Sequence, residues 1–252
     1  MGTVKSEKLK VKSQKGTRSR LAVLKLCALA GLMIAGVAWR ASEGRRTYDP
    51  VPKAALAQVL VRVLDTESSL GPMAKTPQEV TLGDLIRFHG HPCDGLVAAA
   101  EGITLGLKTL FPEGSVDRTD VAAATNASPC YSDVAAYLTG ARTIYGTLVI
   151  DKSLGDEWFL LRRSTGRAVR VRLRPGAKPA EIPAMEKALR AEGCDGPLIA
   201  RLQALQMEFI HRLLASPPKS LYDVDVLPAF PYAVTGERPD AAKARCDDPH
   251  GH

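Results

Sequence analysis

Two imidazoles and one thiol stand within five residues of each other in this chain, at His89, His91 and Cys93. Imidazole nitrogens and thiolate sulfurs are the ligands that zinc and other borderline transition metals prefer. A glycine and a proline separate the three side chains. Both residue types disfavour a regular helix, so the donors can converge on one point. The spacing therefore predicts a transition-metal site that needs one further ligand from elsewhere in the chain.

A second cysteine, Cys130, repeats the setting of Cys93. Each follows a turn that contains proline, and each stands at the start of a helix-like run. The positive end of a helix dipole favours a thiolate, which is the form that binds metal. If the two helix ends face each other, four side chains form one metal site: His89, His91, Cys93 and Cys130.

A disulfide between Cys93 and Cys130 is the alternative to a metal site. An oxidising compartment would permit that bond. A disulfide leaves the two closely spaced histidines unexplained, however, so metal binding is the preferred interpretation.

The frame around these donors is predicted from apolar periodicity. Helical spacing is found in these segments: 54–64, a short helix from Thr81, 96–111, 131–140, 180–191 and 197–215. Short strands are expected at 121–124, 147–150, 157–163, 168–173 and 221–226, with a hairpin turn at 164–167.

The polar face of two of these strands is rich in arginine. A solvated antiparallel face is the preferred interpretation, and an anion-binding surface near the metal site is the alternative. The residues are Arg162, Arg163, Arg167, Arg170, Arg172 and Arg174.

The net charge of +7 belongs to the amino-terminal part of the chain. Residues 1–20 carry seven Lys or Arg against one Glu, and residues 21–46 add an excess of three positive charges. Subtracting both from +7 leaves −2 for residues 47–252. Because the body carries no positive excess, no nucleic-acid partner is expected.

The segment 21–39 is apolar except for Lys25, and its 19 residues are enough to cross a bilayer. The basic residues before it predict a cytoplasmic amino end and a body beyond the membrane. Small residues at 36–38 would also suit a signal peptidase, but the basic region is long for a signal peptide. We expect an uncleaved anchor in a bacterial or archaeal cytoplasmic membrane, with the body facing the periplasm or exterior. If the leader is cleaved, the body is secreted to the periplasm.

At this point the motifs carry a resemblance. The pattern Phe88-His89-Gly90-His91-x-Cys93-x-Gly95 is similar to the opening of the FmdE family, which takes its name from the formylmethanofuran dehydrogenase operon. The likeness continues through Asn126 with Cys130 and Asp133, and through Leu138-Thr139-Gly140. It extends over about residues 80–230, with further similar stretches at 151–173 and 220–226.

The resemblance implies an α+β domain, a small mixed or antiparallel sheet packed with several helices. It also implies zinc or nickel at the histidine–cysteine cluster. Asp94, Asn126 and Asp133 are expected around the ligands. The chain differs from the family pattern at Asp94, where relatives usually have proline. Residues 141–146 lack the cysteine and Gly-Lys-Gly that follow in relatives, and no four-cysteine zinc ribbon closes the chain.

The chain is thus divided into five segments. They are a basic cytoplasmic segment (1–20), the anchor or signal sequence (21–39), a linker and lead-in helix (40–79), the FmdE-like metal-binding domain (80–232) and a polar, disordered tail (233–252). The tail holds three more donors, interpreted as opportunistic metal contacts rather than a second site: Cys246, His250 and His252.

Two classes of function fit this sequence. The first, which we expect, is a membrane-anchored metal-binding protein for sensing, storage or delivery. The second is a metalloenzyme that uses its metal for hydrolysis or for small thiol or anion chemistry, with Asp94 or Asp133 as proton carrier. Three protein ligands with an open position would favour catalysis, whereas four closed ligands would favour structure or sensing. A small anionic or thiol ligand and a homo-oligomer are compatible with either. Formylmethanofuran oxidation itself is not expected, because nothing in the chain would hold a pterin metal centre.

Overall fold

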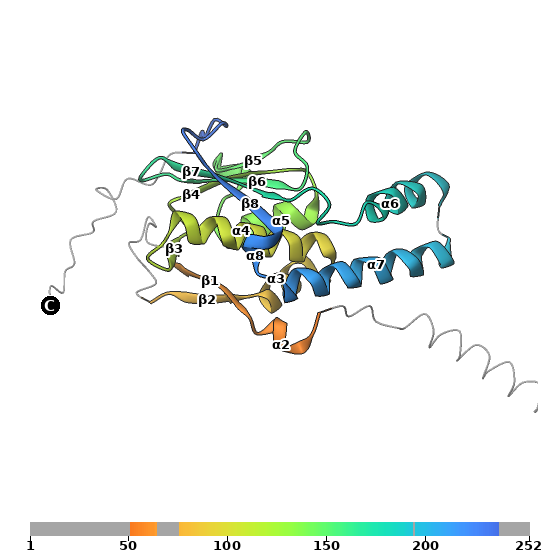
Figure 1. Cartoon of the computed structure of the whole chain (residues 1–252). Coiled ribbons are helices and arrows are strands. Elements are labelled where there is room, and N and C mark those ends of the chain that lie inside the picture. Colours follow the sequence, from red (N-terminus) through yellow and green to blue (C-terminus); the bar gives the residue numbers. More distant parts are fainter. Residues whose placement is uncertain (1–50, 65–75, 194, 237–252) are drawn as a thin grey trace, which may run out of the picture. The chain divides into compact units, whose positions relative to one another are not determined.

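The computed structural model describes residues 51–64, 76–193 and 195–236 (Figure 1). The predicted membrane segment at 21–39 and the donors of the carboxyl-terminal tail lie outside these residues. Within the described part of the chain, no helix combines the length and the hydropathy that a membrane span requires.

The described strands form two sheets. The larger has the order β5-β4-β6-β7-β8, in which β4 and β5 are parallel and every other pair is antiparallel. Its strands are β4 (Val121–Thr125), β5 (Leu148–Ile150), β6 (Glu157–Arg162), β7 (Arg167–Leu173) and β8 (Tyr222–Leu227). In the smaller sheet, β1 (Val59–Leu64) pairs antiparallel with β2 (Gln78–Thr81) and parallel with β3 (Ser115–Asp117).

Helix α4 (Asp94–Leu110) is the centre of the fold. One side lies along β6 and β7 of the larger sheet, while other faces contact β1, α3 and α7 (Figure 1). Fourteen of its 17 residues are buried, which explains why its sequence is apolar on most faces. The remaining helices are α2 (Lys53–Leu56), α3 (Leu82–His89), α5 (Pro129–Thr139), α6 (Glu181–Glu192), α7 (Gly196–Ala215), α8 (Pro218–Leu221) and the 3₁₀ helix η1 (Thr143–Tyr145).

The α+β class is confirmed, and most expected elements lie within two residues of their observed bounds. The expected helix over 54–64 is wrong. Helix α2 stops at Leu56, and β1 follows with Leu60, Val61 and Val63 buried. The β-branched valines suit an extended backbone, and pairing with β2 and β3 satisfies the strand on both edges. The sequence interpretation had missed β2 and β3, and with them the second sheet.

Candidate metal centre

Helix α3 delivers His89 to the site. It begins with a capping box, in which Thr81 accepts from the backbone N–H of Asp84 and the Asp84 carboxylate accepts in return. It ends at Gly90, whose φ of 98° lies in the left-handed region that favours glycine. His89 therefore occupies the last turn of a regular helix, not an irregular loop as expected. Gly90 then turns the chain toward Cys93.

The two cysteines lie at the amino ends of α4 and α5. Cys93 is the N-cap of α4, and its Sγ accepts from Leu96 N at 3.4 Å. Cys130 follows Pro129, the first residue of α5. The helix ends meet closely at Gly95, where an added Cβ would lie 3.2 Å from the Cys130 Cβ.

Three of the four predicted ligands come together. The donor atoms of His89, Cys93 and Cys130 all lie within 4.8 Å of one another. The two sulfurs are 3.2 Å apart, and Cys93 Sγ is 3.9 Å from His89 Nε2. Metal–sulfur and metal–nitrogen bonds of about 2.3 and 2.0 Å let one ion reach such a triplet. Both cysteines are free thiols in this structure.

Asp133 orients the histidine. Its Oδ2 lies 2.8 Å from His89 Nδ1, and the His89 side chain is only 6% exposed. A proton on Nδ1 would be donated to this carboxylate, leaving the lone pair of Nε2 for a metal. Histidine metal ligands almost always donate their other ring N–H to a carboxylate, a backbone carbonyl or a water.

His91 lies apart from this triplet. Its ring is exposed, and its centroid is 4.5 Å from that of His89. Its ligand role therefore stays a prediction. Of the other residues expected around the ligands, Asn126 donates to Gly155 O at 2.8 Å and thereby fixes the loop before β6.

The thiols share a proton unequally. A hydrogen bond from Cys93 lowers the pKa of Cys130 to about 6, with the charge of His89 acting in the same direction. The same hydrogen bond and burial raise the pKa of Cys93. The contact between the two thiols therefore favours a thiolate in the pair, which is the form that binds metal.

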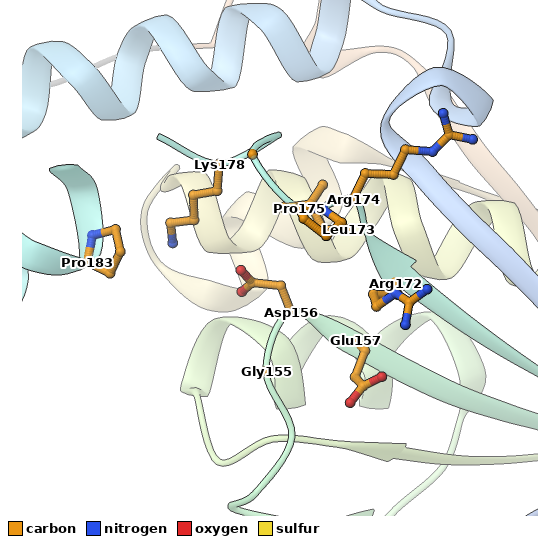
Figure 2. A pocket seen from close by; sticks show the side chains of 10 residues that line it. Gly155, Asp156, Glu157, Arg172, Leu173, Arg174, Pro175, Lys178 and Pro183 are labelled. Atoms are coloured by element: carbon orange, nitrogen blue, oxygen red, sulfur yellow. The ribbon is translucent and has the colours of Figure 1, made fainter. Parts of the chain in front are cut away.

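A cavity of about 400 Å³ opens beside the two sulfurs. Besides Cys93 and Cys130, its wall includes His91, Asp94, Asn126, Asp156, Lys178, Glu186 and Gln206. A second cavity, of about 280 Å³, adjoins it and shares Asp156, Lys178 and Pro183 (Figure 2). In Figure 2 the side chains of Lys178 and Asp156 point toward one another.

Lys178 is held among carboxylates. Its Nζ lies 3.0 Å from Asp94 Oδ2, and the Asp94 side chain is 5% exposed. Burial alone would lower the pKa of Lys178, but Asp94, Asp156 and Glu186 together raise it. The ammonium is therefore kept charged inside the cavity wall.

Asp156 is anchored by Tyr131, whose hydroxyl donates to Asp156 Oδ1. Burial and this carboxylate raise the pKa of Tyr131, which stays a donor. The sequence interpretation missed Asp156, Lys178 and Glu186, because none lies near the histidine–cysteine motif in the chain. The one available signal was that Asp156 stands immediately before an expected strand.

Several strand arginines pair with carboxylates. Arg162 bonds Glu113 and Asp120, Arg170 bonds Asp225, and Arg174 bonds Asp223. Arg172 lies 3.6 Å from Asp223 as well. These ion pairs join strands and turns, so most of the arginines are engaged with carboxylates and are not free to bind an anion.

A protein-family model matches the part of the chain that carries the motif. The family model described as "FmdE, Molybdenum formylmethanofuran dehydrogenase operon" matches residues 88–223. A solved structure of a tungsten formylmethanofuran dehydrogenase FmdE-like protein from Syntrophus aciditrophicus is 20% identical. The match covers 59% of this chain and 72% of that chain, with a TM-score of 0.39. None of the curated proteins matches this chain.

Proposed function

Because this chain belongs to the FmdE family, whose model spans residues 88–223, we propose that it binds one zinc or nickel ion through His89, Cys93 and Cys130. We further propose that the remaining coordination position serves a small molecule in the adjoining cavity. The observation that carries this proposal is a triplet of donors within 4.8 Å of one another, beside a cavity of about 400 Å³. Structural zinc sites use four protein ligands. Three protein ligands with an open fourth position are typical of catalytic zinc sites, where water or substrate binds the metal.

This arrangement favours the metalloenzyme class. The metal would supply Lewis acidity to a bound molecule. Asp133 accepts from His89 and does not line the cavity, so it orients a ligand rather than carrying a proton. Asp94 and Lys178 form an ion pair in the cavity wall, and Asp156 lies beside them, so proton transfer would fall to these groups.

Sensing, storage or delivery is the second candidate, and one observation favours it. The His91 ring lies 4.5 Å from that of His89, so a modest movement would bring it to the triplet as a fourth ligand. A site closed in this way would hold metal without acting on a substrate.

Metal content tests the ligand assignment. The full chain, purified without a histidine tag, is expected to hold about one zinc or nickel ion per molecule by elemental mass spectrometry. Cys93→Ser, Cys130→Ser and His89→Ala should lose it. His211→Ala, which removes an exposed histidine of α7, and Cys246→Ser in the tail should keep it. Full occupancy in Cys93→Ser would refute the assignment, as would a metal-free protein with Cys93 joined to Cys130.

His91→Ala separates the two candidates. An open three-ligand centre keeps its metal in this variant, whereas a centre closed by His91 loses affinity to a degree comparable with His89→Ala.

Membrane anchoring through residues 21–39 is proposed on the apolar run and the basic residues before it. The full chain should then stay in the membrane fraction after alkaline carbonate extraction, and its body should be digested by protease added from the outer side. Release by carbonate would argue against an uncleaved anchor.

A further inference from the structure

The charged side chains of the cavity beside the metal ligands are unbalanced. Asp94, Asp156 and Glu186 line it as three carboxylates, and Lys178 is the one lysine or arginine among its lining residues. Carboxyl groups thus outnumber lysine and arginine by two among the lining residues. Such a wall disfavours a plain anion and attracts a cation.

The lysine is already engaged. It lies 3.0 Å from Asp94, which leaves Asp156 and Glu186 as the carboxylates with acceptor capacity to spare. Asp156 accepts from Tyr131 through Oδ1, and Glu186 accepts from Gln206 Nε2 at 3.3 Å through Oε1. Each keeps a second oxygen. In the part of the chain that the structure describes, no lysine or arginine lies within ion-pair distance of either group.

The cavity wall therefore combines two kinds of group, the thiols and the carboxylates with a spare oxygen. The thiols are those of Cys93 and Cys130, where the proposed function places a metal with an open position. Asp156 and Glu186 come from the loop before β6 and from α6. The adjoining cavity of about 280 Å³ shares Asp156 and Lys178, and its own lining adds Glu157, Arg172 and Arg174 (Figure 2). Both arginines lie near Asp223, so each is already engaged with a carboxylate.

We propose that this cavity binds a small molecule with a protonated amine, which Glu186 and Asp156 receive while a thiol end lies toward Cys93 and Cys130. The amine is inferred from the carboxylates that line the cavity. The thiol end rests on the proposed function. From the sequence we expect a small anionic or thiol ligand. The present proposal retains the thiol group and replaces any further anionic group of the ligand with an amine.

Three thiols with the same two-carbon spacer test the proposal. They are cysteamine, 2-mercaptoethanol and 3-mercaptopropionate, which end in an ammonium, a hydroxyl and a carboxylate. Each is titrated into the full metal-loaded chain by calorimetry under argon, and the metal content of every sample is measured. The expected order is cysteamine tightest and 3-mercaptopropionate weakest. Thiol acidity differs among the probes, so the decisive quantity is how the ratio of the cysteamine and 2-mercaptoethanol Kd values changes between variants.

Glu186→Gln should reduce the preference for cysteamine by about three- to tenfold, the range expected for losing one partly buried charge pair. Glu181→Gln removes the same charge from an exposed position on α6 that does not line the cavity, and it should leave the ratio unchanged. An unchanged ratio in Glu186→Gln, or tightest binding of 3-mercaptopropionate, overturns the amine assignment while metal binding stands. A wild-type chain without metal overturns both proposals.

Discussion

At the scale of single residues, the contact between Asp133 and His89 decides how well the site is prepared for a metal. The side chain of Asp133 is 37% exposed and that of His89 is 6% exposed, so the carboxylate reaches inward to a largely buried ring. It is bonded to the nitrogen that faces away from the sulfurs. Without that contact the ring could rotate or carry its proton on the wrong nitrogen.

Asp133→Ala is therefore expected to weaken metal binding by about 10- to 100-fold, as for other carboxylates that support a histidine ligand. The measurement is a competition titration against a chromophoric zinc chelator. Asp195→Ala is a matched control, because that exposed aspartate makes no side-chain cap hydrogen bond to α7. An affinity within twofold of wild type in Asp133→Ala would mean that His89 is oriented by its packing alone.

The sequence brought the candidate ligands together better than it located the residues around them. His89, Cys93 and Cys130 could be grouped into one site because each belongs to a pattern of neighbouring residues. These patterns are a five-residue motif, a turn with proline and a helix start. Lys178 and Glu186 lie 85 and 93 residues after Cys93. Only the packing of α6 and the segment before it brings them to the cavity, and no short-range signal in the sequence encodes that.

At the scale of elements, the placement of α4 depends on how closely it approaches the larger sheet. An added Cβ at Gly102 would lie 2.7 Å from Trp158 Cζ3 and 3.0 Å from Tyr222 Cε1. Both rings are buried and in contact with other aromatic rings, so neither can swing aside as an exposed chain would. Because α4 also carries Cys93 at its amino end, any shift of this helix is transmitted to the site.

Gly102→Ala should lower the free energy of unfolding by about 1–3 kcal/mol through overpacking, even though alanine is the better helix former by about 1 kcal/mol. Urea denaturation gives the value. Gly196→Ala is the control, since a Cβ at that helical position meets nothing within 4 Å, and it should be neutral or mildly stabilising. A Gly102→Ala variant as stable as wild type would show that α4 can move away from Trp158 at little cost.

The elements that sequence patterns predicted are those specified by neighbouring residues. The capping residues of α3, the long apolar run of α4 and the hairpin between β6 and β7 are all of this kind. Strand β1 is different. Its spacing of Leu60 and Val63 fits a helix as well, and only pairing with β2 and β3 decides the outcome. Those partner strands are too distant in the sequence to be revealed by a pattern of neighbouring residues.

At the scale of the whole molecule, the three proposed ligands lie at the ends of three different helices. His89 ends α3, Cys93 caps α4 and Cys130 opens α5, so a bound ion would join three helix ends. The unfolded chain has no such preformed triplet. A metal that binds the folded state alone stabilises it by about 4 kcal/mol when its free concentration is about 1,000 times its Kd.

Removal of the metal should therefore lower the thermal midpoint. A loss of about 4 kcal/mol corresponds to roughly 8–16 °C for a chain of this size. The comparison is differential scanning calorimetry of the metal-loaded chain before and after a strong chelator. Cys93→Ser, already without metal, should show no further fall. The disulfide alternative predicts the opposite pattern, because its cross-link responds to reductant and not to chelator. A midpoint that falls with reductant alone would therefore support a disulfide between Cys93 and Cys130 and contradict the metal centre.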